Sequence, residues 1–421
     1  MTAVERTEDK SRSPRGDHKI SEGDDPIVAD AFMKAAAMSA TCGVKLCHGG
    51  PFGACVVKSG NIISCAHNSV LLDKDPTCHA EMNAIKQACK ALQSHDLSDC
   101  ELYTTCEPCP MCWGAVQWSR LNKIYIGADR FTAAKYGFDD KVFYDEVEHH
   151  AEVFGLHRYG YMPDSNTHPD KTNKRQKKNM LEVHIGLLRK DCEDLFMDEH
   201  VNKTYRRRKA GTLAKAMGDA FQSRPTSGAS SPEAKAAPGS PQFQLCGLPR
   251  MAPEEEKQLI AAHESFMKKA IEAARLGAKA GTSKEREPFG VVIVHDGRVI
   301  AMESNTVLQS RDATATAEVN AIRTATRILG TYNLEECTLY TTCVPDVMSM
   351  GACLWARIPV IYCGVPTDFT TRFCHEDHMM HFQELMDVSK ENRTIPVKDN
   401  VARDACEDVF KFWSSLNGTI Y

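Results

Sequence analysis

Residues 75–85 read DPTCHAEMNAI, and the stretch DATATAEVNAI stands at residues 312–322, 237 positions later. Asp, Thr, Ala, Glu, Asn, Ala and Ile recur in register, but His79 of the first stretch is Thr316 in the second. The chain therefore carries one motif twice, and the second copy has lost a side chain that can bind a metal.

The repeat extends well beyond this motif. PFGACVV at residues 51–57 recurs as PFGVVIV at residues 288–294, and eleven of the twenty-one residues in 101–121 are identical to their counterparts in 338–358. Near the end of each copy the sequence Cys-Glu-Asp is repeated at a spacing of only 214 residues, so the first copy carries 23 extra residues. We expect these in a polar surface insertion at about 157–180.

Composition divides the chain into two homologous domains. The stretch SRPTSGASSPEAKAAPGSP is rich in Pro, Ser, Ala and Gly, which is typical of a disordered linker. The first 25 residues are polar and charged, which predicts a disordered tail. The predicted organisation is a tail (1–25), a first domain (26–205), a linker (206–251) and a second domain (252–421).

Local patterns in each copy predict the same elements. Helical periodicity marks residues 26–40 and 256–277, and hairpins are expected to turn at Ser59-Gly60 and Asp296-Gly297, where glycine supplies the turn geometry. Further helices and strands alternate after each hairpin, for example a strand in CELYTT followed by a helix in CPMCWGAVQWSRL. This alternation indicates an α/β fold with a mixed sheet.

The overall charge and the cysteine content exclude several classes of protein. The 51 basic and 56 acidic residues give a net charge of −5, which disfavours nucleic acid as a general partner. There is no run of eighteen apolar residues and no apolar N-terminal signal, so we expect no membrane span and a cytoplasmic location. The basic runs at 171–178 and 205–209 are compatible with a nuclear signal. The eighteen cysteines of an intracellular chain are expected to be reduced, with metal binding where their spacing fits.

Three residues of the first copy are candidate metal ligands: His79, Cys109 and Cys112. A Cys-x-x-Cys pair at the start of a helix places two sulfurs one turn apart, so they can share one ion, and Pro110 suits the first helical turn. One imidazole and two thiolates would give Zn²⁺ a neutral ligand set and leave its fourth position open, the pattern of catalytic zinc sites. A structural zinc with Cys78 or Cys106 as a fourth ligand is the competing interpretation.

Glu81 is the candidate catalytic acid and base. It follows His79 by two residues and is not needed as a ligand, so its carboxylate is available to take a proton from water and deliver it elsewhere. His-x-Glu followed thirty residues later by Pro-Cys-x-x-Cys matches a known signature of zinc-dependent nucleobase deaminases.

These motifs resemble the cytidine-deaminase-like superfamily over both copies. The resemblance implies two three-layer α/β/α domains in tandem. Several subfamilies share the zinc motifs, so the substrate class depends on other residues. Gly-Phe-Asp-Asp at 137–140, together with DPTCHAE, CEPCPMC and the C-terminal Tyr421, looks like the guanine deaminases of this superfamily and the related plant guanosine deaminases.

The resemblance also implies the residues that hold the substrate. Phe52 would lie against the purine, Asn68 would hydrogen-bond the base, and Asp140 would face its amino or imino edge. The chemistry agrees, since a carboxylate accepts hydrogen bonds and guanine offers N1–H and its 2-amino group as donors. The implied reaction converts guanine and water to xanthine and ammonia, with Glu81 and Asp140 moving protons. Asn83 departs from the pattern of the guanine group.

The second copy has lost all three ligands but keeps other residues of the site. Thr316, Asp346 and Ser349 replace the ligands, whereas counterparts of four first-copy residues persist: Phe289, Asn305, Glu318 and Trp355. We therefore expect one Zn²⁺ per chain, in the first domain only. We also expect the second domain to pair with the first as the inactive half of a dimer; the alternative is a regulatory purine pocket. By resemblance, the tail ending in Tyr421 would cover the first domain's site.

Competing functions remain at this point. A guanosine deaminase would need room for a ribose at N9 of the base. A tRNA adenosine deaminase with an inactive partner domain would use the basic runs to contact phosphates. A zinc scaffold without activity is the third class. The expected partners are a small purine, the chain's own second domain and, where further association occurs, copies of the same chain.

Overall fold

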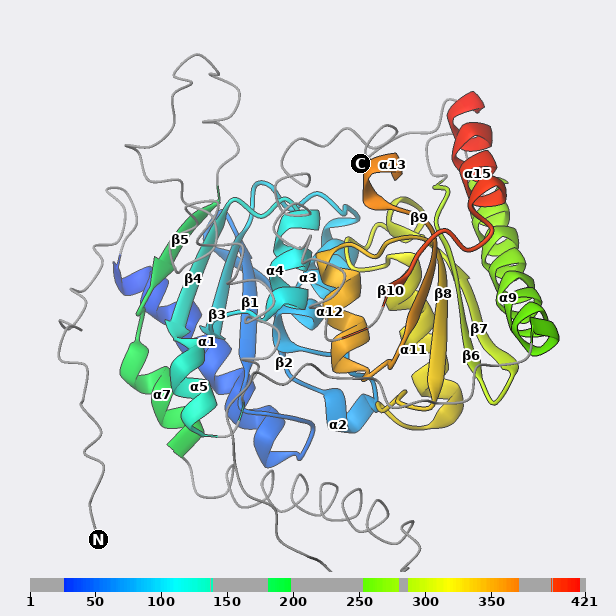
Figure 1. Cartoon of the computed structure of the whole chain (residues 1–421). Coiled ribbons are helices and arrows are strands. Elements are labelled where there is room, and N and C mark those ends of the chain that lie inside the picture. The colour runs from blue at the N-terminus through cyan, green and yellow to red at the C-terminus, as the bar shows by residue number, and fades with distance from the viewer. Residues whose placement is uncertain are drawn as a thin grey trace, which may run out of the picture.

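Two domains of the same architecture lie side by side in the computed structural model (Figure 1). The structure describes residues 26–136, 138, 181–197, 253–279, 287–370, 395 and 397–416. The predicted tail (1–25), insertion (about 157–180) and linker (206–251) lie outside the described residues.

The first domain is built on a five-stranded mixed sheet in the order β2-β1-β3-β4-β5. β1 pairs antiparallel with β2 and β3, and β3, β4 and β5 run parallel. The strands are β1 (Gly53–Lys58), β2 (Asn61–His67), β3 (Glu101–Cys106), β4 (Lys123–Ala128) and β5 (Glu182–Ile185). The described helices are α1 (Pro26–Lys45), α2 (Val70–Asp73), α3 (Ala80–Leu92), α4 (Pro110–Trp118), α5 (Arg130–Lys135) and α7 (Arg189–Met197).

The second domain repeats this topology, with the sheet order β7-β6-β8-β9-β10. Its strands are β6 (Gly290–His295), β7 (Arg298–Ser304), β8 (Cys337–Cys343), β9 (Ile361–Val365) and β10 (Val397–Lys398). Its described helices are α9 (Pro253–Lys279), α10 (Val307–Ser310), α11 (Ala317–Leu329), α12 (Val347–Trp355), α13 (Thr367–Thr370) and α15 (Arg403–Ser415). The predicted tandem α/β fold with mixed sheets is confirmed.

Both predicted hairpins turn where the sequence indicates. Ser59 and Gly60 have φ values of 49° and 76°, and Asp296 and Gly297 have values of 48° and 68°. Two successive positive φ angles define the tight turn whose twist matches that of the flanking antiparallel strands. Each hairpin therefore leads directly from the Pro-Phe-Gly segment through two strands to an Asn.

Helix α1 covers the outer face of the first sheet. Ala29, Met33 and Ala36 are buried on its sheet side. No Cβ would fit at Gly53 of β1, because the backbone of Ala36 lies against it. By length and composition alone, Ile27–Lys45 could cross a membrane, but the core helix of a soluble protein passes the same test. Its buried, small-residue face is that of a helix packed on a sheet.

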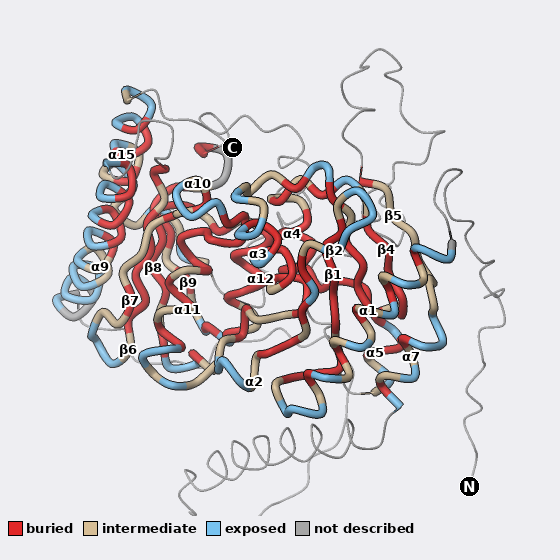
Figure 2. The backbone as a smooth tube through the Cα atoms, turned by 180° about the vertical axis from the view of Figure 1, so that it is seen from behind, coloured by how far each residue is buried: buried red, intermediate tan, exposed pale blue. Residues whose placement is uncertain are grey.

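The two domains meet through their inner helices. α4 of the first domain packs against α12 of the second, and buried segments from both domains meet in the middle of the molecule (Figure 2). A Cβ added to Gly114 would lie 2.7 Å from the Met348 backbone, and one added to Gly351 would lie 2.8 Å from that of Met111. The backbones of the two helices are therefore almost in contact, and one apolar core runs through both domains.

One cysteine pair differs from the expectation of reduced thiols. Cys55 of β1 and Cys65 of β2 lie directly opposite each other and form a disulfide. The other fourteen cysteines of the described residues are free. Direct opposition on antiparallel strands brings two Cβ atoms within bridging distance, which a count of cysteines does not reveal.

Candidate metal centre

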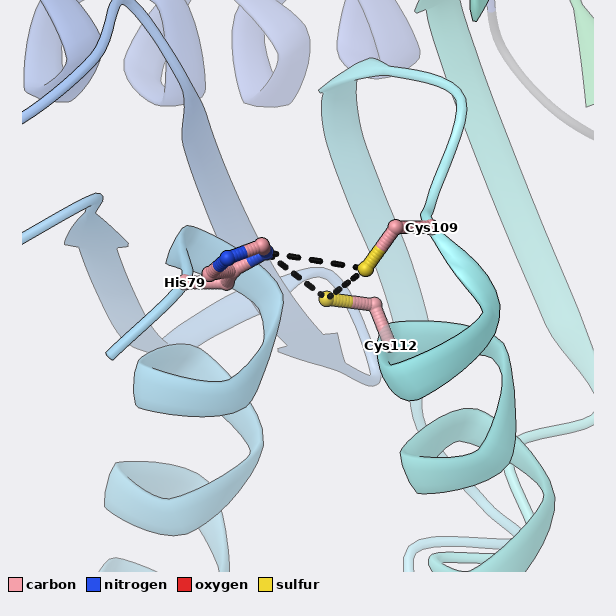
Figure 3. Close-up of side chains that lie close together, drawn as sticks. All are labelled: His79, Cys109 and Cys112. Carbon is pink, nitrogen blue, oxygen red and sulfur yellow. Dashed lines mark hydrogen bonds between the residues drawn. The ribbon is translucent and has the colours of Figure 1, made fainter. Parts of the chain in front are cut away.

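Two helix N-termini meet at the predicted metal ligands of the first domain. His79 is the residue that precedes α3, Cys109 precedes α4, and Cys112 lies one turn into α4. Pro110 stands at the first position of α4, where its missing N–H leaves no hydrogen bond unmade. The three side chains point toward one another from the two helices (Figure 3).

The spacing of the ligand atoms fits Zn²⁺. Nδ1 of His79 lies 3.6 Å from each sulfur, and the two sulfurs are 3.6 Å apart. A tetrahedral zinc with bonds of about 2.0–2.3 Å places its ligand atoms about 3.5–3.8 Å apart. Among the described residues this group contains three ligands, without Cys78 or Cys106. The arrangement supports the interpretation with an open fourth position and gives no support to the structural-zinc alternative.

The surroundings of Cys109 favour its thiolate form, which can bind a cation. Burial by itself raises the pKa of Cys109, but the hydrogen bond from the Cys112 thiol and the His79 imidazole bring that pKa well below its ordinary value. Burial and the neighbouring Cys109 raise the pKa of Cys112. The partial positive charge of the α4 N-terminus adds to the preference for a thiolate. One cation between the three ligands would balance this charge.

Glu81 lies beside the ligands and is only 5% exposed. Its Oε1 accepts a hydrogen bond from the Thr104 hydroxyl at 3.0 Å, and its Oε2 lies 3.5 Å from Sγ of Cys112. Burial, followed by the charge of Cys109, raises the pKa of Glu81. A carboxyl with a raised pKa holds a proton more readily, which suits it to accept and return a proton.

The side-chain oxygen of Asn68 is hydrogen-bonded to the backbone. Its Oδ1 accepts hydrogen bonds from the backbone N–H groups of Gly50 (3.4 Å) and Val70 (3.2 Å). Gly49 lies so close to the Asn68 side chain that no Cβ would fit there. With the oxygen engaged by these backbone donors, Nδ2 is the end that can donate to a base.

Phe52 forms part of an aromatic cluster at the start of β1. Its ring packs edge-on against Phe138 at a centroid distance of 5.1 Å and against Phe196 at 5.6 Å. Phe138 is the one residue of the Gly-Phe-Asp-Asp segment within the described residues, and it lies beside Phe52. The predicted site residues Asp140 and Tyr421 lie outside the described residues.

In the second domain an ordinary hydrogen-bond network replaces the ligand triad. Thr316 precedes α11 and accepts from the Val319 N–H, and Asp346 precedes α12 and accepts from the Ser349 N–H at 3.0 Å. The Ser349 hydroxyl bonds Thr316 (2.9 Å) and Asp346 (2.9 Å). Ligands at helix starts have thus become N-cap residues, which satisfy the same helix ends without a metal.

Glu318 keeps the position of Glu81 inside this network. It accepts from the Thr341 hydroxyl at 2.7 Å, as Glu81 accepts from Thr104. Burial, followed by the nearby Asp346, raises its pKa to about 7. In the described part of the second domain no cluster of metal ligands is present.

Two residues that contact the site, Thr104 and Trp355, received no role in it from the sequence. The Tyr-Thr-Thr segment that contains Thr104 recurs in the second copy, but the repeat does not show which residue Thr104 contacts. A tryptophan stands at the same position of both copies, as Trp118 and Trp355, but no sequence pattern indicates that the Trp355 side chain crosses to the other domain. Its indole N–H donates to Sγ of Cys109 at 3.4 Å.

A His-Cys-Cys triad with an adjacent buried glutamate, carried on this α/β fold, defines a zinc-dependent deaminase. The model of the cytidine and deoxycytidylate deaminase zinc-binding region matches residues 27–128 and 260–365. The chain belongs to this family, in two copies, and the first copy holds the zinc ligands.

Comparison with known proteins gives relatives with different substrates. Guanine deaminase of Bacillus subtilis is 48% identical over 123 residues, which are 29% of this chain and 79% of that protein. tRNA-specific adenosine deaminase of Aquifex aeolicus is 56% identical over 78 residues, which are 18% of this chain and 52% of that protein. The X-ray structure of guanine deaminase from Bacillus subtilis is 39% identical, with a TM-score of 0.28, and covers 32% of this chain and 97% of that one.

Proposed function

We propose that the chain hydrolyses guanine to xanthine and ammonia in purine salvage or catabolism. The packing of Phe138 on Phe52, with ring centroids 5.1 Å apart, carries the proposal. It brings Phe138 of the Gly-Phe-Asp-Asp segment next to the aromatic ring that would face the base, and Asp140 is two residues further along the sequence. Similarity to guanine deaminase over 79% of that protein's length supports the same substrate.

The residues of the site supply the proton transfers of this reaction. Zinc held by His79, Cys109 and Cys112 would lower the pKa of water and so ease its attack on C2. Glu81 takes one proton from the attacking water and gives it to N3 of the ring. It then moves the remaining proton of the C2 hydroxyl to the departing amino group. As the C2–N bond breaks, ammonia leaves, and the oxygen of the water remains on C2 as the carbonyl oxygen of xanthine.

Recognition of guanine follows from donors and acceptors. Asp140 offers only acceptors when ionised, which matches the N1–H and 2-amino donors of guanine. Adenine presents an acceptor at N1, so a carboxylate there disfavours it. Asn68 donates from Nδ2 to an acceptor of the base, because its oxygen is engaged by backbone N–H groups.

The substrate is tested by ammonia release from guanine, guanosine, adenine, cytosine and cytidine, with Glu81→Ala as the inactive control. Asp140→Ala is expected to lower kcat/KM for guanine by about 100-fold or more, since buried donors of the base lose their acceptor. Asp139→Ala, the adjacent acidic residue, is the matched control and should change it by less than about threefold. Unchanged guanine turnover in Asp140→Ala would remove the substrate assignment.

Two alternative activities are deamination of adenosine in tRNA and deamination of guanosine. Identity of 56% to a tRNA-specific adenosine deaminase, together with the basic runs at 171–178 and 205–209, favours a tRNA substrate. That activity predicts tRNA binding that weakens steeply with salt. Guanosine deamination requires room for a ribose at N9 of the base. The relative rates on guanine and guanosine in the same screen show which of these two is the substrate.

A further inference from the structure

Trp355 reaches from the second domain into the metal centre of the first. It is the last residue of α12, and its indole Nε1 lies 3.4 Å from Sγ of Cys109, to which it donates a hydrogen bond. Its ring also packs edge-on against the imidazole of His79, with centroids 4.8 Å apart and planes at 65°. One side chain of the degenerate domain thus contacts two of the three ligands.

The interface between the domains explains how Trp355 reaches this position. Gly351 lies one turn before Trp355, and a Cβ there would stand 2.8 Å from the backbone of Met111 in α4. Because Met111 lies between Cys109 and Cys112, the close approach of the helices brings the end of α12 onto the ligands. A larger residue at position 351 would push this end away.

Trp118, the counterpart of Trp355 in the first domain, does not contact metal ligands among the described residues. Trp118, at the end of α4, packs against Val307 and Ala315 of the second domain. Its side chain also interacts with Asp346, which stands at the position of Cys109. Both tryptophans therefore cross the interface in the same way, but only Trp355 meets metal ligands.

We propose that the second domain serves the zinc centre of the first through Trp355, a positioning residue for Cys109 and His79. The indole N–H fixes the direction of the Cys109 sulfur and withdraws electron density from it, while the ring restrains the rotation of the imidazole. Hydrogen bonds to metal ligands commonly change metal affinity by about 10–100-fold. The inference rests on the ligand triad and does not depend on which base is deaminated.

The test compares Trp355→Phe with Trp118→Phe in the full chain. Zinc affinity is measured by competition with a chelator. The sulfur-to-metal charge-transfer band is recorded after replacement of zinc by Co²⁺. A third variant carries benzothienylalanine at position 355, which keeps the size of the indole but replaces its N–H by sulfur. All variants are also unfolded in denaturant to compare their stability.

We expect Trp355→Phe and the benzothienylalanine variant to bind zinc about tenfold more weakly. In both, the charge-transfer band should move to lower energy, because the sulfur regains electron density. Trp118→Phe should leave affinity within about twofold and the band unmoved. Unchanged affinity and spectrum at position 355, or equal changes in the Trp118 variant, would overturn the proposal. If Trp355→Phe does not fold, the benzothienylalanine variant decides by the same criteria.

Discussion

The second domain should bind zinc if the three metal ligands are introduced at the positions that correspond to the triad of the first domain. The triple variant Thr316→His, Asp346→Cys and Ser349→Cys recreates the triad on a backbone that already has the required shape. φ and ψ are −64° and 162° at Thr316 against −72° and 159° at His79. They are −68° and 177° at Asp346 and −70° and 168° at Cys109. We expect the zinc content to rise from one to two ions per chain.

The energetic cost of this change can be estimated from the hydrogen bonds that it removes. Thr316 and Asp346 each cap a helix, and loss of a cap costs about 1 kcal/mol. The metal-free variant should therefore lose about 2 kcal/mol of unfolding free energy. Zinc at about a thousand times its dissociation constant returns about 4 kcal/mol. Zinc should thus leave the loaded variant more stable than the natural chain.

The assay combines metal content by elemental analysis with denaturant unfolding in zinc or in chelator. The double variant Thr316→His, Asp346→Cys is the matched control, because it lacks the third ligand and should retain one zinc. A folded triple variant that still holds a single zinc would contradict this expectation. It would show that something other than the ligand side chains closed the second site.

Three further predictions concern the catalytic residue, the retained glutamate and the C-terminal tail. Glu81→Gln should keep zinc but lower kcat by about 10²–10⁴-fold in an ammonia assay; a loss below tenfold would contradict its role. Burial and Asp346 raise the pKa of Glu318 to about 7. Between about pH 4.5 and pH 7 the folded chain therefore keeps a proton that the unfolded chain releases, and the free energy of unfolding falls as the pH rises through this range. Glu318→Gln should therefore stabilise the chain by up to about 3 kcal/mol at pH 8 and little at pH 4, as measured by denaturant unfolding; equal effects at both pH values would disprove this. Deleting residues 417–421 should lower kcat/KM by about tenfold with zinc retained, because the tail is predicted to close the first site; unchanged kinetics would exclude it.

The elements and the ligands could be predicted because they depend on short segments. The hairpins follow from the Ser-Gly and Asp-Gly turns, and the ligands follow from their positions at helix starts. His79 and Glu81 are two residues apart, and Cys109 and Cys112 are one turn apart, so one local conformation places each pair. The repeat then identified Thr316 and its neighbours as losses.

Other contacts of the site were beyond such reasoning because they join residues that are distant in the chain. Thr104 meets Glu81 only because β3 runs beside the start of α3. The orientation of the Asn68 amide depends on Gly49 and Gly50, which bring backbone against its side chain. Periodicity and spacing describe neighbours in sequence, and they contain no information on these encounters.

Sequence patterns were sufficient to identify a duplicated α/β protein with one intact metal triad and one degenerate copy. The packing of the two domains was needed to show that Trp355 of the degenerate copy contacts Cys109 and His79 of the intact site. Helix starts and turns are set by interactions within a few residues, which the sequence displays directly. The position of Trp355 depends instead on the close contact of two helices at Gly114 and Gly351, and that contact exists only once both domains have folded and packed.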